Sequence, residues 1–522
     1  MEILRGGVTP SAQNNSEGVT EASDVSKETP DGQVASWNPD YNVTWEDMAE
    51  ITFVYPWMSA IPTGLAEVEA AINEITEKEI NVHVHLEMLE SGNYDQQVNL
   101  MITSGEVVDL MVTMAGGSTS FTTMVSQNQL MDVTELLNEY APKAVEALGE
   151  LMEATAVDGK IMAFPAYRNY AAGPYIEMRT DVLEDLGLLE KAQNMTSFSE
   201  YEEILEAVKN SDKWGNLVGI VPMSSGAVLP NSQAYAYSDQ FSDITFIDNL
   251  GNTQYCVGVK NGDEDGVVFN AYASEAYKNN WELVRGWYEK GYIYEDAATT
   301  TDTGNELIKS GVAFSMINNM GVGAQAAASL VCGRDMTCVL VASKPVDTTA
   351  CASFTYGVPV TAKEPEAAIT FMEMMFNDQR VANLLAWGIE DSDYMIDDAG
   401  VAHYIDGNEQ PAYHGVSWTM VNEFKVSPWE GETLENWLGQ EEYLKSAPIS
   451  EFLGFSMDTE NLNNEISAIS TVIREFGGQI GSGIADEAAF NQFLEKLDAS
   501  GIDKVVSAYQ EQLNRWLEEN NR

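Results

Sequence analysis

Apolar residues in the first part of the folded chain alternate between the spacing of strands and that of helices. Residues 51–55, ended by Pro56, predict a buried strand because the run is short and rich in β-branched and aromatic side chains. Further strand-like runs follow at 82–86 and 107–114. Two helical stripes separate them: Leu65, Val68, Ile72 and Ile75, then Tyr94, Val98, Met101 and Ile102, with Gly105 as a left-handed cap. The strand–helix order predicts an α/β lobe with a parallel sheet.

Loops at the carboxyl ends of these strands are candidate ligand contacts, because ligands of α/β sheets collect there. Trp57 follows the first strand. Gly116 and Gly117 follow the third strand, and glycines let backbone N–H groups come close to a bound molecule. An ordinary turn explains the glycines equally well.

Beyond residue 180 the pattern becomes mainly helical, and its apolar stripes predict core. One stripe contains Tyr277, Trp281, Val284 and Tyr288, another Phe371, Met372, Met375 and Phe376, and the last helix contains Ile502, Val505, Tyr509, Leu513 and Trp516. We expect the C-terminal helices to pack on a second lobe.

Length and charge limit the function. A chain of 522 residues exceeds what one core usually supports, so two lobes are expected. Its 26 Lys and Arg against 82 Asp and Glu give a net charge of −56, which disfavours nucleic acid and anionic membrane surfaces as partners. Acidity itself identifies no ligand.

Residues 1–45 are expected to form a disordered tether. From residue 7 they are dominated by small polar and acidic residues that bury too little surface to offset the entropy of ordering. Such a leader remains when a lipoprotein loses its signal peptide and anchor cysteine, although an added expression sequence or natural disorder has the same composition. No apolar run of about 18 residues is present.

Catalytic and metal motifs are missing from the sequence. It contains no G-x-S-x-G, H-E-x-x-H or P-loop pattern and no C-x-x-C. His83 and His85 share a strand face without a third ligand, which favours a structural role over a metal site. Cys332 and Cys338 are able to bridge a hairpin, but buried free thiols are at least as consistent with their spacing. We expect no catalytic residue, no metal and no cofactor.

Two partial motifs are better explained as turns. Gly321-x-Gly323-x-x-Ala326 resembles a dinucleotide-binding turn but lacks the acidic residue about twenty positions later. Residues 261–266 begin like a calcium loop, yet its twelfth position is Tyr272 rather than Glu.

Several segments together resemble the extracellular solute-binding proteins of ABC importers, in particular the sugar-binding branch. The matching residues are Tyr94-x3-Val98-x2-Met101-x3-Gly105-x3-Asp109-Leu110, residues 158–165, Arg179-x-Asp181-Val182-Leu183-x-x-Leu186-Gly187, residues 311–314 and residues 356–359. From about Phe371 the chain is similar to the end of LipO-like lipoproteins, on the cues 387–390 through Tyr394, Ser427-Pro428 and 499–505. Residues 415–418 depart from the turn expected in that family.

The resemblance implies a two-lobed, periplasmic-binding-protein-like (Venus flytrap) α/β fold with extra C-terminal helices on the second lobe. The first lobe is expected to comprise residues 46–166 plus 319–362. The second is expected to comprise residues 167–318 plus 363–522, including the LipO-like region at about 371–520.

The implied function is capture of a small polar ligand, in particular an oligosaccharide, by hinge closure, without catalysis, for delivery to the permease subunits of an ABC importer. The implied location is extracellular, anchored to the cell surface as a lipoprotein, and we expect a monomer. The alternatives are a secreted glycoside hydrolase, whose acid pair is defined by spatial distance rather than sequence, and a peptide receptor or surface adhesin.

Candidate ligand contacts are aromatic residues, which stack on the apolar face of a sugar ring, and polar residues, which bind its hydroxyls. In addition to Trp57, Gly116 and Gly117, the candidates are Tyr167, Arg168, Tyr170, Tyr235, Tyr237, Asn318, Asn319, Trp387, Glu390 and Tyr394.

Overall fold

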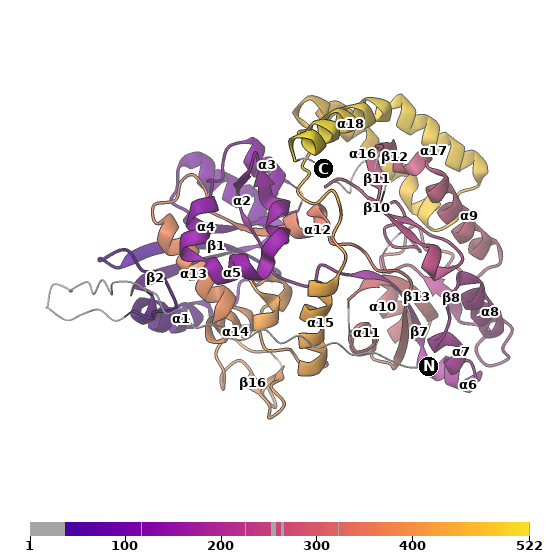
Figure 1. Cartoon of the computed structure of the whole chain (residues 1–522). Coiled ribbons are helices and arrows are strands. Elements are labelled where there is room, and N and C mark those ends of the chain that lie inside the picture. The colour runs from indigo at the N-terminus through magenta and orange to yellow at the C-terminus, as the bar shows by residue number, and fades with distance from the viewer. Residues whose placement is uncertain are drawn as a thin grey trace, which may run out of the picture.

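The computed structural model describes residues 37–520 except 116, 225, 252–256, 263–265, 322 and 409. Figure 1 shows two α/β lobes side by side, with the helix α15 (Leu434–Ser446) between them and the helices α16 (Asn463–Gly481), α17 (Glu487–Ala499) and α18 (Ile502–Glu519) on the second lobe. The predicted two-lobed fold with C-terminal helices on the second lobe is confirmed.

The first lobe is built on a sheet of strand order β2-β1-β3-β15-β6. Phe53, fully buried on β1, pairs in parallel with Leu86 on β2 and with Leu110 on β3, which confirms the predicted parallel arrangement. Gly105 caps the intervening helix α2 in the left-handed conformation, with φ 78°. The strands are β1 (Ala49–Trp57), β2 (Val82–Glu90), β3 (Leu110–Met114), β6 (Phe164–Pro165) and β15 (Phe354–Gly357).

Helices cover this sheet on both faces. A large cluster of buried side chains packs α1, α13 and α14 on one side, and a smaller cluster packs α2 and α3 on the other. The helices of this lobe are α1 (Leu65–Glu79), α2 (Ser91–Ser104), α3 (Phe121–Ser126), α4 (Thr134–Tyr140), α5 (Pro142–Leu148), α12 (Thr348–Ala352), α13 (Pro365–Asn377) and α14 (Gln379–Trp387).

The second lobe is built on a sheet of order β14-β7-β13-β8, in which β7 runs antiparallel to both β14 and β13. Its strands are β7 (Gly173–Arg179), β8 (Val218–Val221), β13 (Ala313–Met320) and β14 (Met336–Leu340). Its helices are α6 (Thr180–Asp185), α7 (Leu189–Gln193), α8 (Phe198–Lys209), α9 (Glu275–Glu289), α10 (Gly304–Lys309) and α11 (Ala324–Cys332).

Helix α9 joins that sheet to an outer part of the second lobe. Val284 and Trp287 on α9 pack into the core of the sheet, whereas Tyr277 and Trp281 pack against α16–α18. The Trp281 ring stacks on Phe490 of α17 at 4.6 Å between centroids. A small antiparallel sheet completes this part: β9 (Tyr235–Ala236), β10 (Thr245–Asp248), β11 (Val257–Lys260) and β12 (Phe269–Asn270). The predicted apolar stripe of α9 is therefore core.

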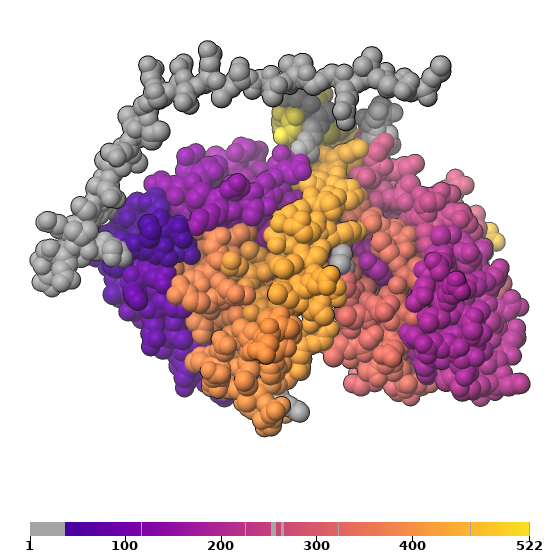
Figure 2. Space-filling model, turned by 60° about the horizontal axis from the view of Figure 1, so that its bottom comes forward, coloured from indigo at the N-terminus to yellow at the C-terminus, as the bar shows by residue number. Residues whose placement is uncertain are grey.

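In the described chain, three segments cross between the lobes: 166–172, 341–347 and 447–455. The second and third crossing segments are hydrogen-bonded to each other, because Val346 N–H donates to Pro448 O at 2.8 Å and Ser450 N–H donates to Val346 O at 2.9 Å. The third crossing segment begins after α15. Figure 2 shows the golden-orange surface of this part of the chain between the two lobes.

The division of the chain between the lobes differs from the expected one. We expected 363–522 in the second lobe, but the apolar side chains of α13 and α14 complete the core beneath β1. We expected 319–362 in the first lobe, but β14 belongs to the sheet of the second lobe and α11 is a helix of that lobe. The chain therefore crosses only after Leu340. Both differences arise because contacts distant in sequence decide which sheet an apolar face covers.

The N-terminal boundary also differs. Residues 1–36 lie outside the described residues, and 37–45, expected to belong to the tether, pack on the first lobe. Asn38 N–H donates to Glu79 O at 2.9 Å, and Trp45 Nε1 donates to Asn81 O at 3.0 Å. Among the described helices, none is both long and apolar enough to cross a membrane.

Candidate ligand-binding site

The carboxyl edge of the first sheet meets the first crossing segment at Ser353. Just after β3, Ala115 N–H donates to Ser353 O at 2.8 Å. From the crossing segment, Arg168 Nη2 donates to Ser353 Oγ at 2.6 Å. Arg168 is thereby fixed at the carboxyl edge of the first sheet, on a segment that connects the two lobes.

Three aromatic rings surround the Arg168 guanidinium. Its central carbon lies 5.7 Å from the centroid of Tyr170, 5.9 Å from that of Phe354 and 5.7 Å from that of Trp418. Tyr170 and Phe354 are buried, but Trp418 is 38% exposed. Trp418 is thus the ring of this group that a ligand can reach.

The turn that carries Trp418 is anchored to the sheet beneath it. It is a short 3-10 helix, η4 (Ser417–Thr419). Tyr356 on β15 donates its hydroxyl hydrogen to Thr419 O at 2.6 Å, and the Tyr55 hydroxyl on β1 is hydrogen-bonded to the Thr419 hydroxyl. The Trp418 ring meets Phe354 edge-on at 5.5 Å between centroids. These contacts fix the orientation of an exposed ring, as stacking on a sugar requires.

Glu423 places a partly buried carboxylate next to this turn. Its oxygens accept hydrogen bonds from Asn169 N–H at 3.2 Å and from Ser417 Oγ at 3.4 Å. Burial raises the pKa of the Glu423 carboxyl above its ordinary value, although Asn169 and the nearby Arg168 charge oppose the shift. A guanidinium, a carboxylate and an exposed indole therefore lie together.

The second lobe approaches the same crossing segment through the end of β13. A methyl group on Gly321 would lie 2.1 Å from Asn169 Nδ2, so the Asn169 side chain packs directly against the Gly321 backbone. Asn318 and Asn319 lie just before it and are partly buried. Among the described residues the buried Asn319 Oδ1 has no hydrogen-bond partner, whereas Asn318 Nδ2 is hydrogen-bonded to Met320 Sδ at 3.4 Å and the Asn318 side chain also interacts with the Glu177 carboxylate. Both predicted asparagines are thus near the crossing segment.

Tyr167 and Tyr170 lie on the crossing segment as predicted, but their rings face inward. Tyr167 packs between Phe376 and Phe424, at 5.7 and 5.3 Å between centroids. The Tyr170 hydroxyl is hydrogen-bonded to Ala166 O. The structure therefore gives these two rings a supporting role next to Arg168.

Trp57 and Trp387, predicted as sugar platforms, lie in the core of the first lobe instead. Trp57 is 3% exposed and packs on Tyr413 at 4.9 Å, and Trp387 is 5% exposed and packs on Trp429 at 4.7 Å. Both are covered by the segment after α14, which the sequence placed in the other lobe.

Glu390 and Tyr394 lie in the turn that follows α14. The backbones of these two residues form an isolated β-bridge; the Glu390 side chain is exposed and Tyr394 is buried. The described contacts of the Arg168 side chain include neither Glu390 nor Tyr394.

The remaining candidates lie elsewhere. Gly116 falls outside the described residues, and Gly117 (φ 72°) is tightly packed against the Asp95 carboxylate. Tyr235 and Tyr237 are buried in the core of the second lobe, with ring centroids 5.5 Å apart. Burial makes these two rings unsuitable as platforms in the form described here.

Sequence reasoning missed Trp418, Ser353 and Glu423 as site residues. Trp418 belongs to the run 415–418, where the sequence departs from the related family, and that departure was its one signal. Ser353 and Glu423 carry no local signal, because both lie far from Arg168 in the sequence. Ser353 is more than 180 positions from Arg168, and Glu423 is more than 250 positions from it.

The described residues provide no metal site, since no group of three His, Cys, Asp or Glu side chains is suitably placed. His83 Nδ1 lies 2.7 Å from Glu77 Oε1, a surface contact. Cys332, Cys338 and Cys351 are free thiols, and Cys256 is outside the described residues.

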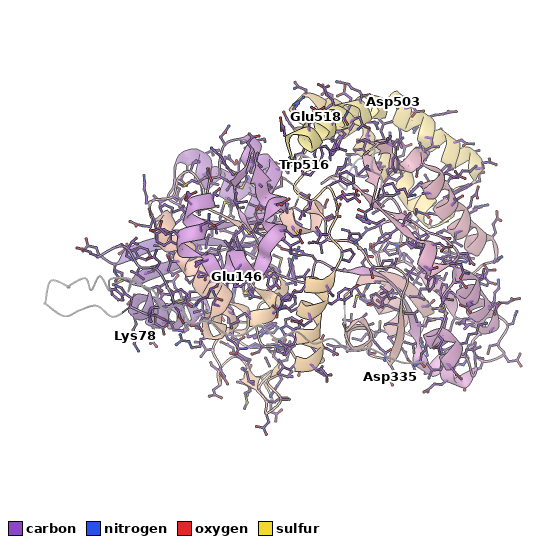
Figure 3. The ribbon with its side chains drawn as sticks, viewed as in Figure 1. Lys78, Glu146, Asp335, Asp503, Trp516 and Glu518 are labelled. Atoms are coloured by element: carbon purple, nitrogen blue, oxygen red, sulfur yellow. The ribbon has the colours of Figure 1, made fainter. Side chains whose placement is uncertain are left out.

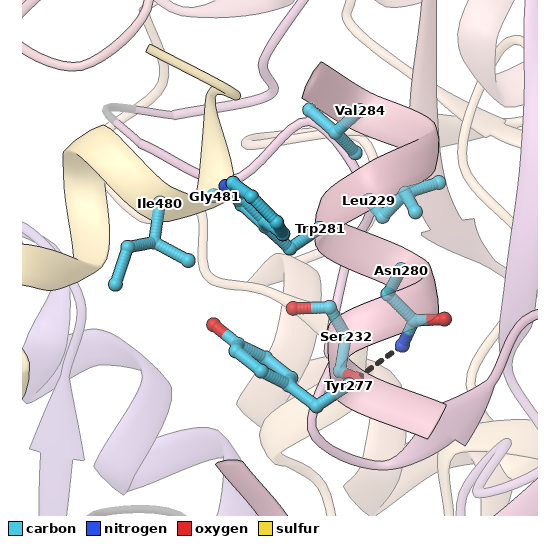
Figure 4. Close-up of a pocket in the computed structure, with 8 residues that line it drawn as sticks. All are labelled: Leu229, Ser232, Tyr277, Asn280, Trp281, Val284, Ile480 and Gly481. Carbon is cyan, nitrogen blue, oxygen red and sulfur yellow. Dashed lines mark hydrogen bonds between the residues drawn. The ribbon is translucent and has the colours of Figure 1, made fainter. Parts of the chain in front are cut away.

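A separate pocket lies inside the second lobe, between α9 and α16 (Figure 4). Its lining is mainly apolar, and the Asn280 amide is already used, because Nδ2 donates to Ser232 O and to Tyr235 O, both at 2.7 Å. Its lining residues all come from the second lobe, so it is a pocket within that lobe rather than an interlobe site.

Comparisons with known proteins are consistent with this architecture. A carbohydrate ABC transporter substrate-binding protein of Streptococcus pneumoniae is 24% identical over 465 residues, covering 87% of this chain and 89% of the relative. The crystal structure of the N-glycan transport solute binding protein NgtS from the same species superposes with a TM-score of 0.75 at 21% identity, covering 90% of this chain and 100% of that one. The substrate-binding protein FusA of S. pneumoniae, in complex with kestose, gives 0.56 at 14% identity, covering 91% and 100%.

Family models match two regions. A domain of unknown function matches residues 451–518, which contain the end of the third crossing segment, α16, α17 and nearly all of α18. A model of bacterial extracellular solute-binding proteins matches residues 70–389, more than half of the chain and parts of both lobes. The chain therefore belongs to the family of bacterial extracellular solute-binding proteins.

Proposed function

We propose that this protein captures an oligosaccharide between its lobes and delivers it to the permease subunits of an ABC importer. The carrying observation is the exposed Trp418 ring, fixed next to Arg168 of the first crossing segment, to which Glu423 is hydrogen-bonded. An indole face stacks on the apolar face of a sugar ring, while a guanidinium donates hydrogen bonds to its hydroxyls.

The proposed ligand contacts are Trp418, Arg168 and Ser353 on the first-lobe side, with Asn318 and Asn319 on the second. The buried Asn319 Oδ1 has no partner among the described residues, and a ligand hydroxyl would satisfy it. Because contacts with both lobes favour the closed state, ligand binding shifts the population toward closure.

The named ligands of similar proteins support an oligosaccharide. NgtS was crystallised with Man1GlcNAc, and FusA with kestose. NgtS gives a TM-score of 0.75, whereas its Man1GlcNAc complex gives 0.66 at similar identity and the same coverage of this chain. This difference is the result expected if the two lobes sit at different angles in those structures.

The proposal also covers where the protein acts and its oligomeric state. The protein acts outside the cell as a monomer, anchored by a lipid on its N-terminal tether, and it binds without turnover. The family supports the extracellular location, and the net charge of −56 keeps the protein away from anionic lipid surfaces, so that anchoring depends on the tether.

The decisive experiment is a melting screen against mono- and oligosaccharides, with amino acids and peptides as controls, followed by calorimetry and solution scattering on the hits. We expect saturable binding of an oligosaccharide, a raised Tm and a smaller radius of gyration. Chromatography of the same mixtures should show unchanged oligosaccharide. Product release would establish the glycoside hydrolase, and binding of peptides alone would establish the peptide receptor.

A further inference from the structure

The first crossing segment is fastened along its length to residues 421–423. Tyr167 N–H donates to Val421 O at 2.7 Å, and Glu423 N–H donates to Tyr167 O at 2.9 Å. The third link uses a side chain, since Asn169 N–H donates to Glu423 Oε2 at 3.2 Å. The Glu423 carboxylate therefore adds a third hydrogen bond to the two that the backbones of these segments form.

The second oxygen of the same carboxylate reaches the turn that carries the exposed ring. Glu423 Oε1 accepts a hydrogen bond from Ser417 Oγ at 3.4 Å, and Ser417 immediately precedes Trp418. Glu423 is thus the one side chain described here that is hydrogen-bonded to both the crossing segment and the Trp418 turn.

The charged and titratable groups around Glu423 come from several elements. Arg168 and Tyr170 face it from the crossing segment, and Ser417 from η4. Gln440 and Glu441 of α15 contact that segment at Asn169 and Tyr167, and Lys445 pairs with Glu441 at 3.1 Å. Burial holds the pKa of the Tyr170 phenol well above its ordinary value, so this neighbour stays neutral at physiological pH.

We propose that Glu423 is a positioning residue of the ligand site: its ionised carboxylate joins the crossing segment to the Trp418 turn, and its protonation weakens ligand binding. The inference rests on the proposed function. Protonation turns two charge-assisted hydrogen bonds into neutral ones, which are about half as strong, and removes the attraction to Arg168. Ligand affinity is therefore present above the pKa of Glu423 and is lost as the pH falls through it.

The test compares wild type with Glu423→Gln, which imitates the protonated form at every pH. We expect wild-type affinity for an oligosaccharide identified in the screen to fall about tenfold from a pH well above the pKa of Glu423 to one well below it, the scale of a charged hydrogen bond. Glu423→Gln should show the weaker affinity at both pH values and no slope between them. Glu441→Gln, the matched control on α15, should keep the wild-type slope.

A measurement without ligand separates this inference from the proposed function. Trp418 emission should respond to pH in wild type, and that response should be absent in Trp418→Phe and in Glu423→Gln. If wild type binds no saccharide but the emission responds as described, the proposed function fails and the positioning role stands. An unchanged pH slope of affinity or of emission in folded Glu423→Gln overturns the positioning role.

Discussion

The Arg168 guanidinium carbon lies 5.7 Å from the centroid of the Trp418 ring, although 250 residues separate the two in sequence. Arg168 belongs to the first crossing segment and Trp418 to a turn anchored on the first sheet. A cation close to an indole ring stabilises its orientation. This contact therefore links the segment that we propose bends during closure to the ring that we propose holds the ligand.

Replacing Trp418 with alanine should weaken ligand binding by about 1–3 kcal/mol, the usual cost of losing a contact at the centre of an interface. Because the ring is 38% exposed, we expect little change in Tm. Calorimetry and thermal melting check the two quantities. The buried Trp57→Ala and Trp387→Ala variants should show the opposite pattern, with about 3–5 kcal/mol lost from the free energy of unfolding. Wild-type affinity in Trp418→Ala would remove this ring from the site.

Arg168→Lys should weaken binding although it keeps the charge. An ammonium lacks the planar fork that donates to Ser353 while lying among three rings. We expect about 1 kcal/mol of lost affinity, the scale of one exposed cation–π contact. Arg179→Lys is the matched control, because Arg179 lies 5.2 Å from the Trp214 centroid in the second lobe, outside the site. Equal losses in the two variants would contradict a specific role for Arg168.

Glu177→Gln should make stability less dependent on pH. Glu177 is fully buried on β7, and burial raises the pKa of its carboxyl to about 7. Because the folded pKa exceeds the unfolded one, the stability that this proton contributes is complete below the ordinary value of 4.5 and is lost as the pH rises to about 7.

At pH 8 we therefore expect Glu177→Gln to be more stable than wild type, by an amount on the order of 3 kcal/mol. At pH 4.5 the two should be similar. Denaturant unfolding at both pH values measures this difference, and the exposed Glu184→Gln should follow wild type. An equal effect at both pH values would show that Glu177 does not titrate in this range.

Lys344→Met should lower the free energy of unfolding more at pH 8 than at pH 5. Lys344 Nζ pairs with Asp347 at 2.8 Å on the second crossing segment, next to the buried Asp248. Burial and the Asp347 charge raise the pKa of Asp248 to about 6, so its stabilising proton is lost as the pH rises through that value. Without the lysine, two buried carboxylates remain together.

The loss in Lys344→Met should reach about 3 kcal/mol at pH 8, the lower end for breaking a buried pair. Thermal melting at pH 5 and pH 8 checks the prediction. The surface pair of Lys290 with Glu202 provides the control, and Lys290→Met should cost little at either pH. If the free energy of unfolding falls equally at both pH values, Lys344 stabilises the second crossing segment by packing alone.

The sequence alone determined the elements whose contacts are local. The order β1, α1, β2, α2, β3 followed from apolar spacing, and Gly105 followed from the need for a left-handed cap. The stripe of α9 was also predicted as core. The order of these first-lobe elements depends on neighbours one or two elements away, because a short crossover returns the chain to the adjacent strand. The stripe of α9 was predicted from its periodicity, although its partners on α16–α18 lie far along the chain.

Tertiary structure alone decided which tryptophans are buried and which lobe receives α13 and α14. Trp57 ends β1 and Trp418 lies in the short helix η4; Tyr413 covers Trp57, whereas Trp418 remains open beside Arg168. The covering residues come from segments hundreds of positions away. Side-chain exposure is a sum over all packed neighbours, and periodicity along the chain reports which face is apolar but not which surface will cover it.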